Sequence, residues 1–421
     1  MDNQIKTTRK PYAQAWRTLI KDYIFSIYRR ESKPLRFVIV LVLAGIAGGL
    51  YKGVQDNYLV EILHITPFER GIVEFFRELP GFLLVFILAL MYRLSESRIF
   101  KIGNAVMLAG MIGLLLCKSE KFIVVVFMVL WSIGEHIVLP LKNSISLDFA
   151  KAEKSGASLG LTSTITNLGN IAGFIAVTVL FFILGRLGFT RTDTIPFRIV
   201  FATTCALMIG ASLTALAISE TKTQIKRRRF YFAKKYNKYY VLEILYGARK
   251  QVFFTFGPLV LIKEYGANTS IIAMLLAISA AFGMFFSPLI GKLIDKLGYK
   301  SIMVADTLIL IVVCFFYGFS HRIFSVHIAF FAVCVNYIAD AILSLCSMAS
   351  NVYAKSISDN QEELTSTLST GISVNHFISI FVALLGGYIW NITGIEVLFS
   401  ISALLGLINS LFAATIKPRH T

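Results

Sequence analysis

The chain has 421 residues, of which 56% are hydrophobic and only 15% are charged, and its mean hydropathy is +0.71. Soluble domains are about 45–50% apolar and about 25% charged, so the composition excludes an ordinary soluble protein. The net charge of +17 does not predict nucleic-acid binding, because the basic residues lie beside apolar segments, and we expect no nucleic-acid partner.

Residues 1–34 are predicted to form a basic cytoplasmic arm. Its apolar residues from Trp16 to Ile27 follow helical spacing, with Arg17 and Lys21 among them. This pattern predicts an amphipathic helix that lies on the anionic inner leaflet, with membrane lipids as partners. A solvated tether is the alternative interpretation.

Twelve apolar segments follow, each near the roughly 20 residues that a helix needs to cross a bilayer. We predict a first six-helix bundle over 35–219 and a second over 240–416, joined by a basic linker at 220–239 and followed by a tail at 417–421. The predicted spans are 35–62, 71–92, 99–117, 122–141, 157–184, 196–218, 240–262, 269–294, 302–319, 323–349, 364–390 and 395–416.

Lysine and arginine are concentrated in the arm and in the linker, where the sequence runs KRRRFYFAKKYNKYY. Short cytoplasmic segments carry such a positive excess. We therefore expect a multi-pass protein of the cell membrane with both termini in the cytoplasm.

The two halves of the chain repeat each other. The sequence Leu-Thr-Ser-Thr at 161–164 recurs 203 residues later at 364–367, and Glu135 has its counterpart in Asp340. Parallel repeats of this size are typical of secondary transporters, in which two bundles rock around a central site.

Residues 291–300, GKLIDKLGYK, lie between the second and third spans of the second half. They resemble the GxLxDrxGrk motif of the major facilitator superfamily. A second copy at 92–101 keeps an acid at Glu96 but lacks both glycines. The resemblance implies an all-α membrane protein of twelve transmembrane helices in two pseudo-symmetric six-helix bundles. It also implies a cytoplasmic gating motif formed by Gly291, Asp295, Gly298, Lys300 and Glu96.

Ionisable residues inside the spans are the candidate functional residues. A charge at mid-bilayer costs about 2.5–3.5 kcal/mol on insertion scales, so such residues normally face a cavity or a partner. They concentrate on spans 1, 4, 7 and 10, which the resemblance implies line the central cavity, and they are Lys52, Asp56, Glu135, His136, Arg249, Lys250 and Asp340.

Glu135 and Asp340 are predicted to couple transport to protons, together with His136. A carboxyl group in a cavity can bind a proton from one side and release it to the other, and histidine titrates near neutral pH. The alternative is that Arg249 or Lys250 neutralises both acids permanently. Sodium coupling also stays open.

The remaining candidates are assigned to the cargo and to a gate. A polar or anionic organic solute would contact a group of cavity residues made of Lys52, Asp56, Tyr246, Arg249, Lys250 and Phe253. Neighbouring residues of a helix point about 100° apart, so we expect one of Arg249 and Lys250 to face the cavity. An outer charge network, either a gate or a structural clamp, is predicted from Asp56, Glu74, Arg77 and Glu78.

The sequence therefore predicts a monomeric secondary active transporter that moves a small molecule by alternating access. An exporter of drugs or amphiphiles with the same fold, or a sensor that binds solute without moving it, are the alternatives. The chain has no HExxH, GxSxG or P-loop motif, so we predict no enzyme activity, no cofactor and no metal.

Overall fold

The computed structural model describes residues 21–219, apart from 92 and 152, and residues 232–416. The early arm, most of the linker and the tail at 417–421 lie outside the described residues. Within the described part, regular structure is helical throughout, and the sole β contact is one isolated bridge between Tyr28 and Ala150.

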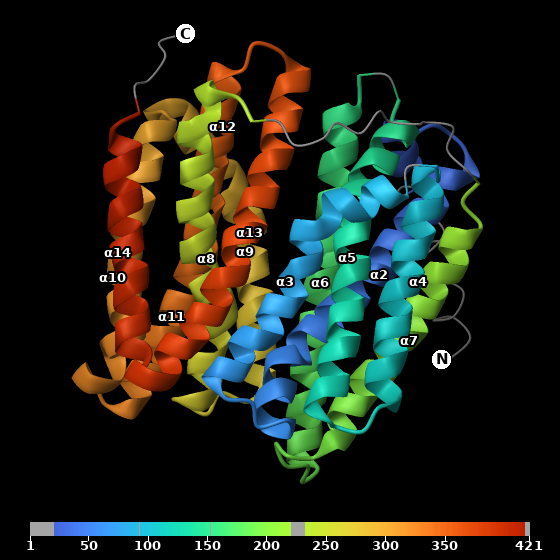
Figure 1. Cartoon of the computed structure of the whole chain (residues 1–421). Coiled ribbons are helices and arrows are strands. Elements are labelled where there is room, and N and C mark those ends of the chain that lie inside the picture. Colours follow the sequence, from blue (N-terminus) through green and yellow to red (C-terminus); the bar gives the residue numbers. More distant parts are fainter. Residues whose placement is uncertain (1–20, 92, 152, 220–231, 417–421) are drawn as a thin grey trace, which may run out of the picture.

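The first half of the chain makes six helical passes (Figure 1). The first pass is α2, which a π-helical turn, η1, prolongs. The elements are α2 (Ser32–Asn57), η1 (Tyr58–Ile62), α3 (Pro67–Leu90), α4 (Glu96–Leu116), α5 (Lys121–Phe149), α6 (Ser155–Arg186) and α7 (Thr194–Leu216).

The second half also makes six passes, and its fourth is assembled from α11, η3 and α12. The elements are η2 (Lys234–Tyr236), α8 (Asn237–Lys263), α9 (Thr269–Leu297), α10 (Tyr299–Ile323), α11 (Val326–Leu343), η3 (Ser344–Ser347), α12 (Met348–Ile357), α13 (Gln361–Thr393) and α14 (Ile395–Ala414). The predicted fold of twelve helices in two bundles is confirmed.

Several helices begin before the predicted apolar segments because polar residues cap them. Thr66 accepts a hydrogen bond from the Glu69 backbone N–H, and the Glu69 side chain accepts one from the Thr66 backbone N–H, which starts α3 at Pro67. Asn360 caps α13 in a similar way by accepting a hydrogen bond from the Glu363 backbone N–H, and α13 starts at Gln361. Arg70, which the sequence placed in a loop, therefore lies inside α3.

In the part of the chain that the structure describes, ten helical segments are long and apolar enough to cross a membrane by length and composition. The two other passes, α3 and α8, carry clusters of ionisable side chains instead. These two passes lie in different halves, and both contact α13. The two passes with these clusters therefore pack against one common helix, α13.

The described part of the arm packs on protein. Residues 21–27 are helical, and Ile24 and Ile27 are buried in a cluster with Phe37 and Phe149. The sequence predicted that this face would meet the membrane surface, and these two side chains instead meet the first bundle.

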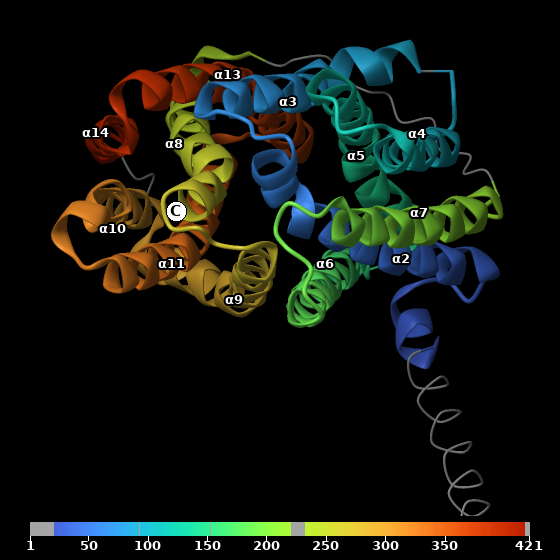
Figure 2. The same ribbon diagram turned by 90° about the horizontal axis from the view of Figure 1, so that it is seen from below.

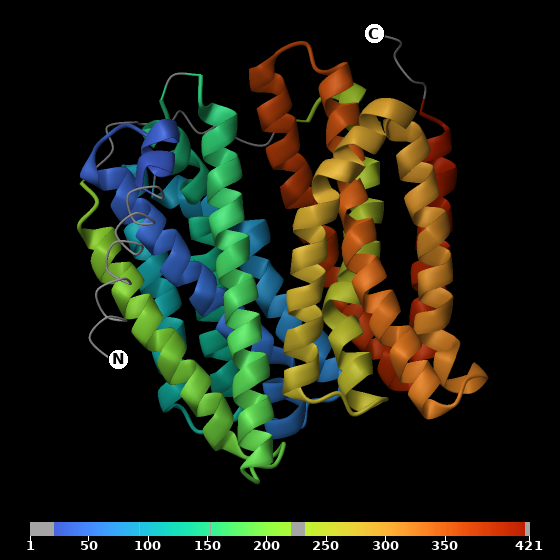
Figure 3. The same cartoon turned by 180° about the vertical axis from the view of Figure 1, so that it is seen from behind.

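The two bundles contact each other through α3 with α13 and through α6 with α9 (Figures 2 and 3). We call the end of the molecule that carries the turn at 63–66 the short-loop end, and the end where α7 stops and α8 starts the linker end. Phe68 and Tyr388 pack together near the short-loop end, and Phe82 and Phe377 pack near the middle. Beyond Phe82, α3 packs into its own bundle, and the ribbons diverge toward the linker end (Figure 1).

Glycines allow the close approach of α3 and α13. A Cβ atom on Gly71 would lie 2.4 Å from the carbonyl oxygen of Ala383, and one on Gly387 would lie 2.6 Å from that of Pro67. These separations leave no room for a side chain, so both positions require glycine in this conformation.

At the linker end, the predicted gating motif forms a tight turn. Gly298 has a φ of +79° and joins α9 to α10, which explains the glycine. Gly291 lies in the last part of α9, Asp295 is exposed there, and Lys300 is half-buried.

An ion-pair cluster lies at the same end of the molecule. The Lys235 ammonium group forms ion pairs with the carboxylates of Asp359 and Glu363, and these carboxylates raise its pKa.

Replacing Gly387 by alanine should destabilise the protein, because the new methyl group meets the backbone of α3. Overpacking of this kind costs about 1–3 kcal/mol. Thermal unfolding in detergent should show a lower Tm for Gly387→Ala than for Gly283→Ala, a matched control with open space at its Cβ position. Equal Tm values for the two variants would contradict the proposed close packing.

Candidate functional site

An ion pair joins the last third of α2 to the middle of α5. The Lys52 ammonium group lies 2.5 Å from the Glu135 carboxylate, and the two side chains are 38% and 31% exposed. Lys142, one more cation on α5, interacts electrostatically with both groups. Ionisable side chains inside membrane-spanning helices normally face the bundle interior or a water-filled cavity, so this partly exposed pair is a candidate solute contact.

A buried charge network lies nearer the short-loop end. Arg70 contacts Asp56 at 3.0 Å and Glu74 at 2.6 Å, and Glu74 also contacts Arg77 at 2.8 Å. The Ser132 hydroxyl donates to the Arg77 carbonyl oxygen, which ties the network to α5. Two cations and two anions therefore neutralise each other between α2 and α3.

This network differs from the predicted one. Arg70 is its centre, whereas the sequence prediction left Arg70 in a loop. Glu78, which was predicted to belong to the network, contacts His376 instead. Asp56, which was predicted both in this network and at the solute site, forms an ion pair with Arg70, and its side chain is 12% exposed.

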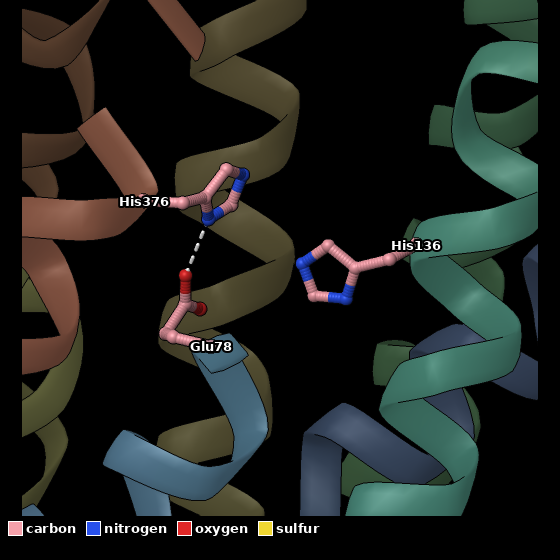
Figure 4. A group of neighbouring side chains, drawn as sticks. All are labelled: Glu78, His136 and His376. Atoms are coloured by element: carbon pink, nitrogen blue, oxygen red, sulfur yellow. Dashed lines mark hydrogen bonds and ion pairs between the residues drawn. The ribbon is translucent and has the colours of Figure 1, made fainter. Parts of the chain in front are cut away.

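Glu78 lies with two histidines where the bundles meet. The Glu78 carboxylate is 2.7 Å from Nδ1 of His376 on α13, and the rings of His136 and His376 are 5.3 Å apart (Figure 4). The sequence reasoning missed His376, although a histidine within an apolar span was a usable signal. The cluster brings both halves together at one point.

In the second bundle, Arg249 is engaged in a structural contact. Its guanidinium lies 3.0 Å from the Asp306 carboxylate and 5.2 Å from the centre of the Tyr246 ring, and the side chain is 2% exposed. Lys250 is exposed, so it is the member of this pair that a solute can reach. Asp306 was also missed, although it is an acid inside a predicted span.

Two predicted contact residues have other roles. Phe253 is buried between Tyr317 and Phe399 in the core of the second bundle, with ring separations of 5.2 Å to each. The Tyr246 hydroxyl donates to the Ser344 carbonyl oxygen. Both were expected to contact cargo, and the rotation of α8 directs them toward protein instead.

Asp340 on α11 is half-buried. Arg249 and Lys250 act on it electrostatically, but within the described residues no ion pair or hydrogen bond engages its carboxylate. The alternative of permanent neutralisation by Arg249 is disfavoured, because Asp306 already holds that guanidinium.

These groups form a line of charge between the two bundles. Glu135 interacts electrostatically with Lys52 and His136, and Glu78 interacts with His136 and Lys250. Lys250 in turn acts on Asp340. A solute entering between the bundles would meet cations from both of them.

The family model of the Major Facilitator Superfamily matches residues 37–354 and 239–421. The chain belongs to this superfamily. Among curated proteins, no sequence matches it.

Solved structures of transporters share the fold. A mutant form of the nucleoside transporter NupG is 15% identical with a TM-score of 0.72, covering 91% of this chain and 99% of that one. A D-xylose-proton symporter is 14% identical with a TM-score of 0.70, covering 91% and 97%. A bacterial homologue of the human lysosomal transporter Spinster is 16% identical with a TM-score of 0.67, covering 90% and 95%.

Removing the central cation of the buried network should be strongly destabilising. Arg70→Met leaves Asp56 and Glu74 without that cation, and breaking a buried ion pair costs about 3–5 kcal/mol. Thermal unfolding of the purified protein checks this loss.

Arg322→Met is the matched control, because Arg322 pairs with Glu396 while 68% exposed. Exposed pairs contribute about 0–1 kcal/mol, so this variant should unfold close to the wild-type temperature. A similar Tm loss in both variants would refute the buried-network interpretation.

Proposed function

We propose that the protein is a proton-coupled secondary transporter that moves a small polar or anionic organic solute by alternating access. The observation that carries the proposal is the partly exposed Lys52–Glu135 ion pair, which joins α2 to α5 in a fold of this superfamily. A nucleoside transporter and a sugar-proton symporter with the same fold support a polar solute.

The proposed orientation rests on the positive charge of the arm and linker. It puts both termini in the cytoplasm and the short-loop end outside a cell membrane. In that orientation the contacts of α3 with α13 close the outer side, and the exposed Asp295 belongs to a cytoplasmic latch that is released. The proposed unit is a monomer surrounded by lipid.

In the proposed cycle, an anionic group of the solute contacts Lys52 from the first bundle and Lys250 from the second. The solute competes with Glu135 for the Lys52 ammonium group, so binding exchanges one counter-ion for another. Contacts from both bundles make binding sensitive to their relative position, which is what alternating access requires.

Asp340 is the proposed proton carrier. Its carboxylate lies in the membrane-spanning part of α11 and, within the described residues, is held by no ion pair, so it is free to bind a proton. Glu135, first paired with Asp340 on the basis of the repeat, is assigned instead to the ion pair with Lys52, from which an anionic solute would displace it.

Neutralising the proton carrier should separate solute movement from proton movement. In proteoliposomes with a trapped pH dye, screened against pools of organic anions, sugars, nucleosides and cationic drugs, the wild-type protein should give solute-dependent proton flux. Asp340→Asn should abolish that flux but keep solute exchange.

Asp359→Asn is the control, because Asp359 is an exposed acid at the linker end. Wild-type proton flux in Asp340→Asn would exclude this residue as the carrier. Solute binding without any flux would favour a sensor, and activity confined to cationic drugs would favour an exporter.

Removing the accessible cations should weaken solute binding. A hydrogen bond to a charged group contributes about 1.5–3 kcal/mol, so Lys250→Gln should raise the Kd of an anionic solute by about 10-fold to 100-fold. Lys52→Gln is combined with Glu135→Gln, because Lys52→Gln alone would leave the Glu135 carboxylate without its counter-ion.

Lys292→Gln, an exposed lysine near the end of α9, serves as the control and should bind normally. Unchanged binding in Lys250→Gln and in the double variant would remove the proposed anion contact. Equilibrium binding of radiolabelled solute measures each case.

A further inference from the structure

The cluster of Glu78, His136 and His376 has the composition of a metal site. Each residue offers one donor atom, and the three atoms lie within 4.8 Å of one another. They come from α3, α5 and α13, so two donors belong to the first bundle and one belongs to the second (Figure 4). We propose that these residues bind Zn²⁺ or a chemically similar divalent transition metal.

The orientation of His136 favours metal binding through Nε2. Its Nδ1 atom lies 2.8 Å from the Ser132 carbonyl oxygen, a contact that requires the proton on Nδ1. The Nε2 atom then keeps its lone pair, and Figure 4 shows one ring nitrogen directed toward Glu78 and His376. A histidine held by a backbone carbonyl on its far nitrogen is a common arrangement of metal ligands.

Gly81 keeps the space between the donor atoms open. A Cβ atom at this position would lie 2.8 Å from His136 Nε2 and 2.8 Å from His376 Nδ1. Pro80 precedes it, and its ring interrupts the backbone hydrogen bonding of α3 at this level. Any side chain at position 81 would occupy the place where an ion meets both nitrogens.

The donor set selects the metal. Zn–N bonds of about 2.0–2.1 Å place the donors of a tetrahedral site roughly 3.3 Å apart, so the cluster needs only small side-chain rotations to reach that spacing. Two imidazoles and one carboxylate suit Zn²⁺, whereas Ca²⁺ and Mg²⁺ prefer oxygen ligands. A fourth position is left for water or for a polar group of a solute.

Because the ligands come from both bundles, a bound ion would hold the bundles together. His376 is brought to Glu78 and His136 by the packing of α13 on α3, and the ion stabilises only conformations that keep this packing. Metal binding would therefore stabilise the conformation in which α13 packs on α3 and slow the proposed alternating-access cycle. The site uses none of Lys52, Lys250 and Asp340 as a ligand, so metal binding can be tested without the proposed cargo and proton groups.

Zinc binding to the purified full-length protein tests the proposal. Competition with a chromophoric zinc chelator near neutral pH should give one tight site per chain, which an excess of Mg²⁺ or Ca²⁺ does not occupy. His376→Ala and Glu78→Gln should each weaken binding at least about tenfold. Gly81→Ala retains all three ligands and should also lose affinity, because its methyl group fills the site.

Histidines outside the cluster provide the controls. His321→Ala and His327→Ala, at the short-loop end, should bind zinc like the wild-type protein. Zinc should raise the Tm of the wild-type protein and of these controls but not that of His376→Ala, a readout that also reports whether each variant is folded.

The proposal is overturned if folded wild-type protein binds no zinc with saturation, or if His136→Ala combined with His376→Ala leaves binding intact. Substitution by Co²⁺ identifies the ligands further. An absorption spectrum typical of Co²⁺ with nitrogen and oxygen ligands supports the proposed site. A thiolate charge-transfer band would assign the ion to a cysteine and overturn the proposal. None of these measurements requires transport, so the metal-site proposal can be refuted without refuting the proposed transport function, and the reverse also holds.

Discussion

Charge neutralisation inside the membrane-spanning helices is the constraint on which this structure depends. A bilayer interior offers no water to a buried ion, so each deeply buried charge must find a counter-ion on a neighbouring helix. Arg70 and Arg249, the most buried cations of the two bundles, meet acids on α2, α3 and α10. These contacts determine how the charged helices α3 and α8 are rotated, and hence which side chains remain accessible.

The accessible charges follow from that rotation. Turning Arg249 toward Asp306 leaves its neighbour Lys250 on another side of α8, and the Arg70 network leaves Lys52 to pair with Glu135. The positions of the candidate solute contacts therefore depend on the same helix rotations that form the buried ion pairs. Disturbing the buried pairs would also misplace the accessible ones.

The contact between the bundles combines backbone proximity with titratable groups. Glycines let α3 and α13 approach near the short-loop end, and the Glu78–His376 contact follows at mid-height. Metal ions and protons can compete for a contact between a carboxylate and a histidine, whereas they do not compete for an apolar contact. The middle of α3 therefore carries the titratable part of the contact between the bundles.

The sequence alone determined the twelve helical passes, the internal duplication and the family. Hydrophobic length and repeated motifs are local properties, and a chain in lipid must satisfy its backbone hydrogen bonds as helices. It also placed Lys52, Glu135 and Asp340 inside apolar spans. Only the tertiary structure decided which side chains pair, because pairing depends on which helices are neighbours and on how each helix is rotated. It engaged Arg70 and Arg249 in ion pairs and buried Phe253 in the core. It also brought His376 to Glu78, which is 298 residues away in the sequence.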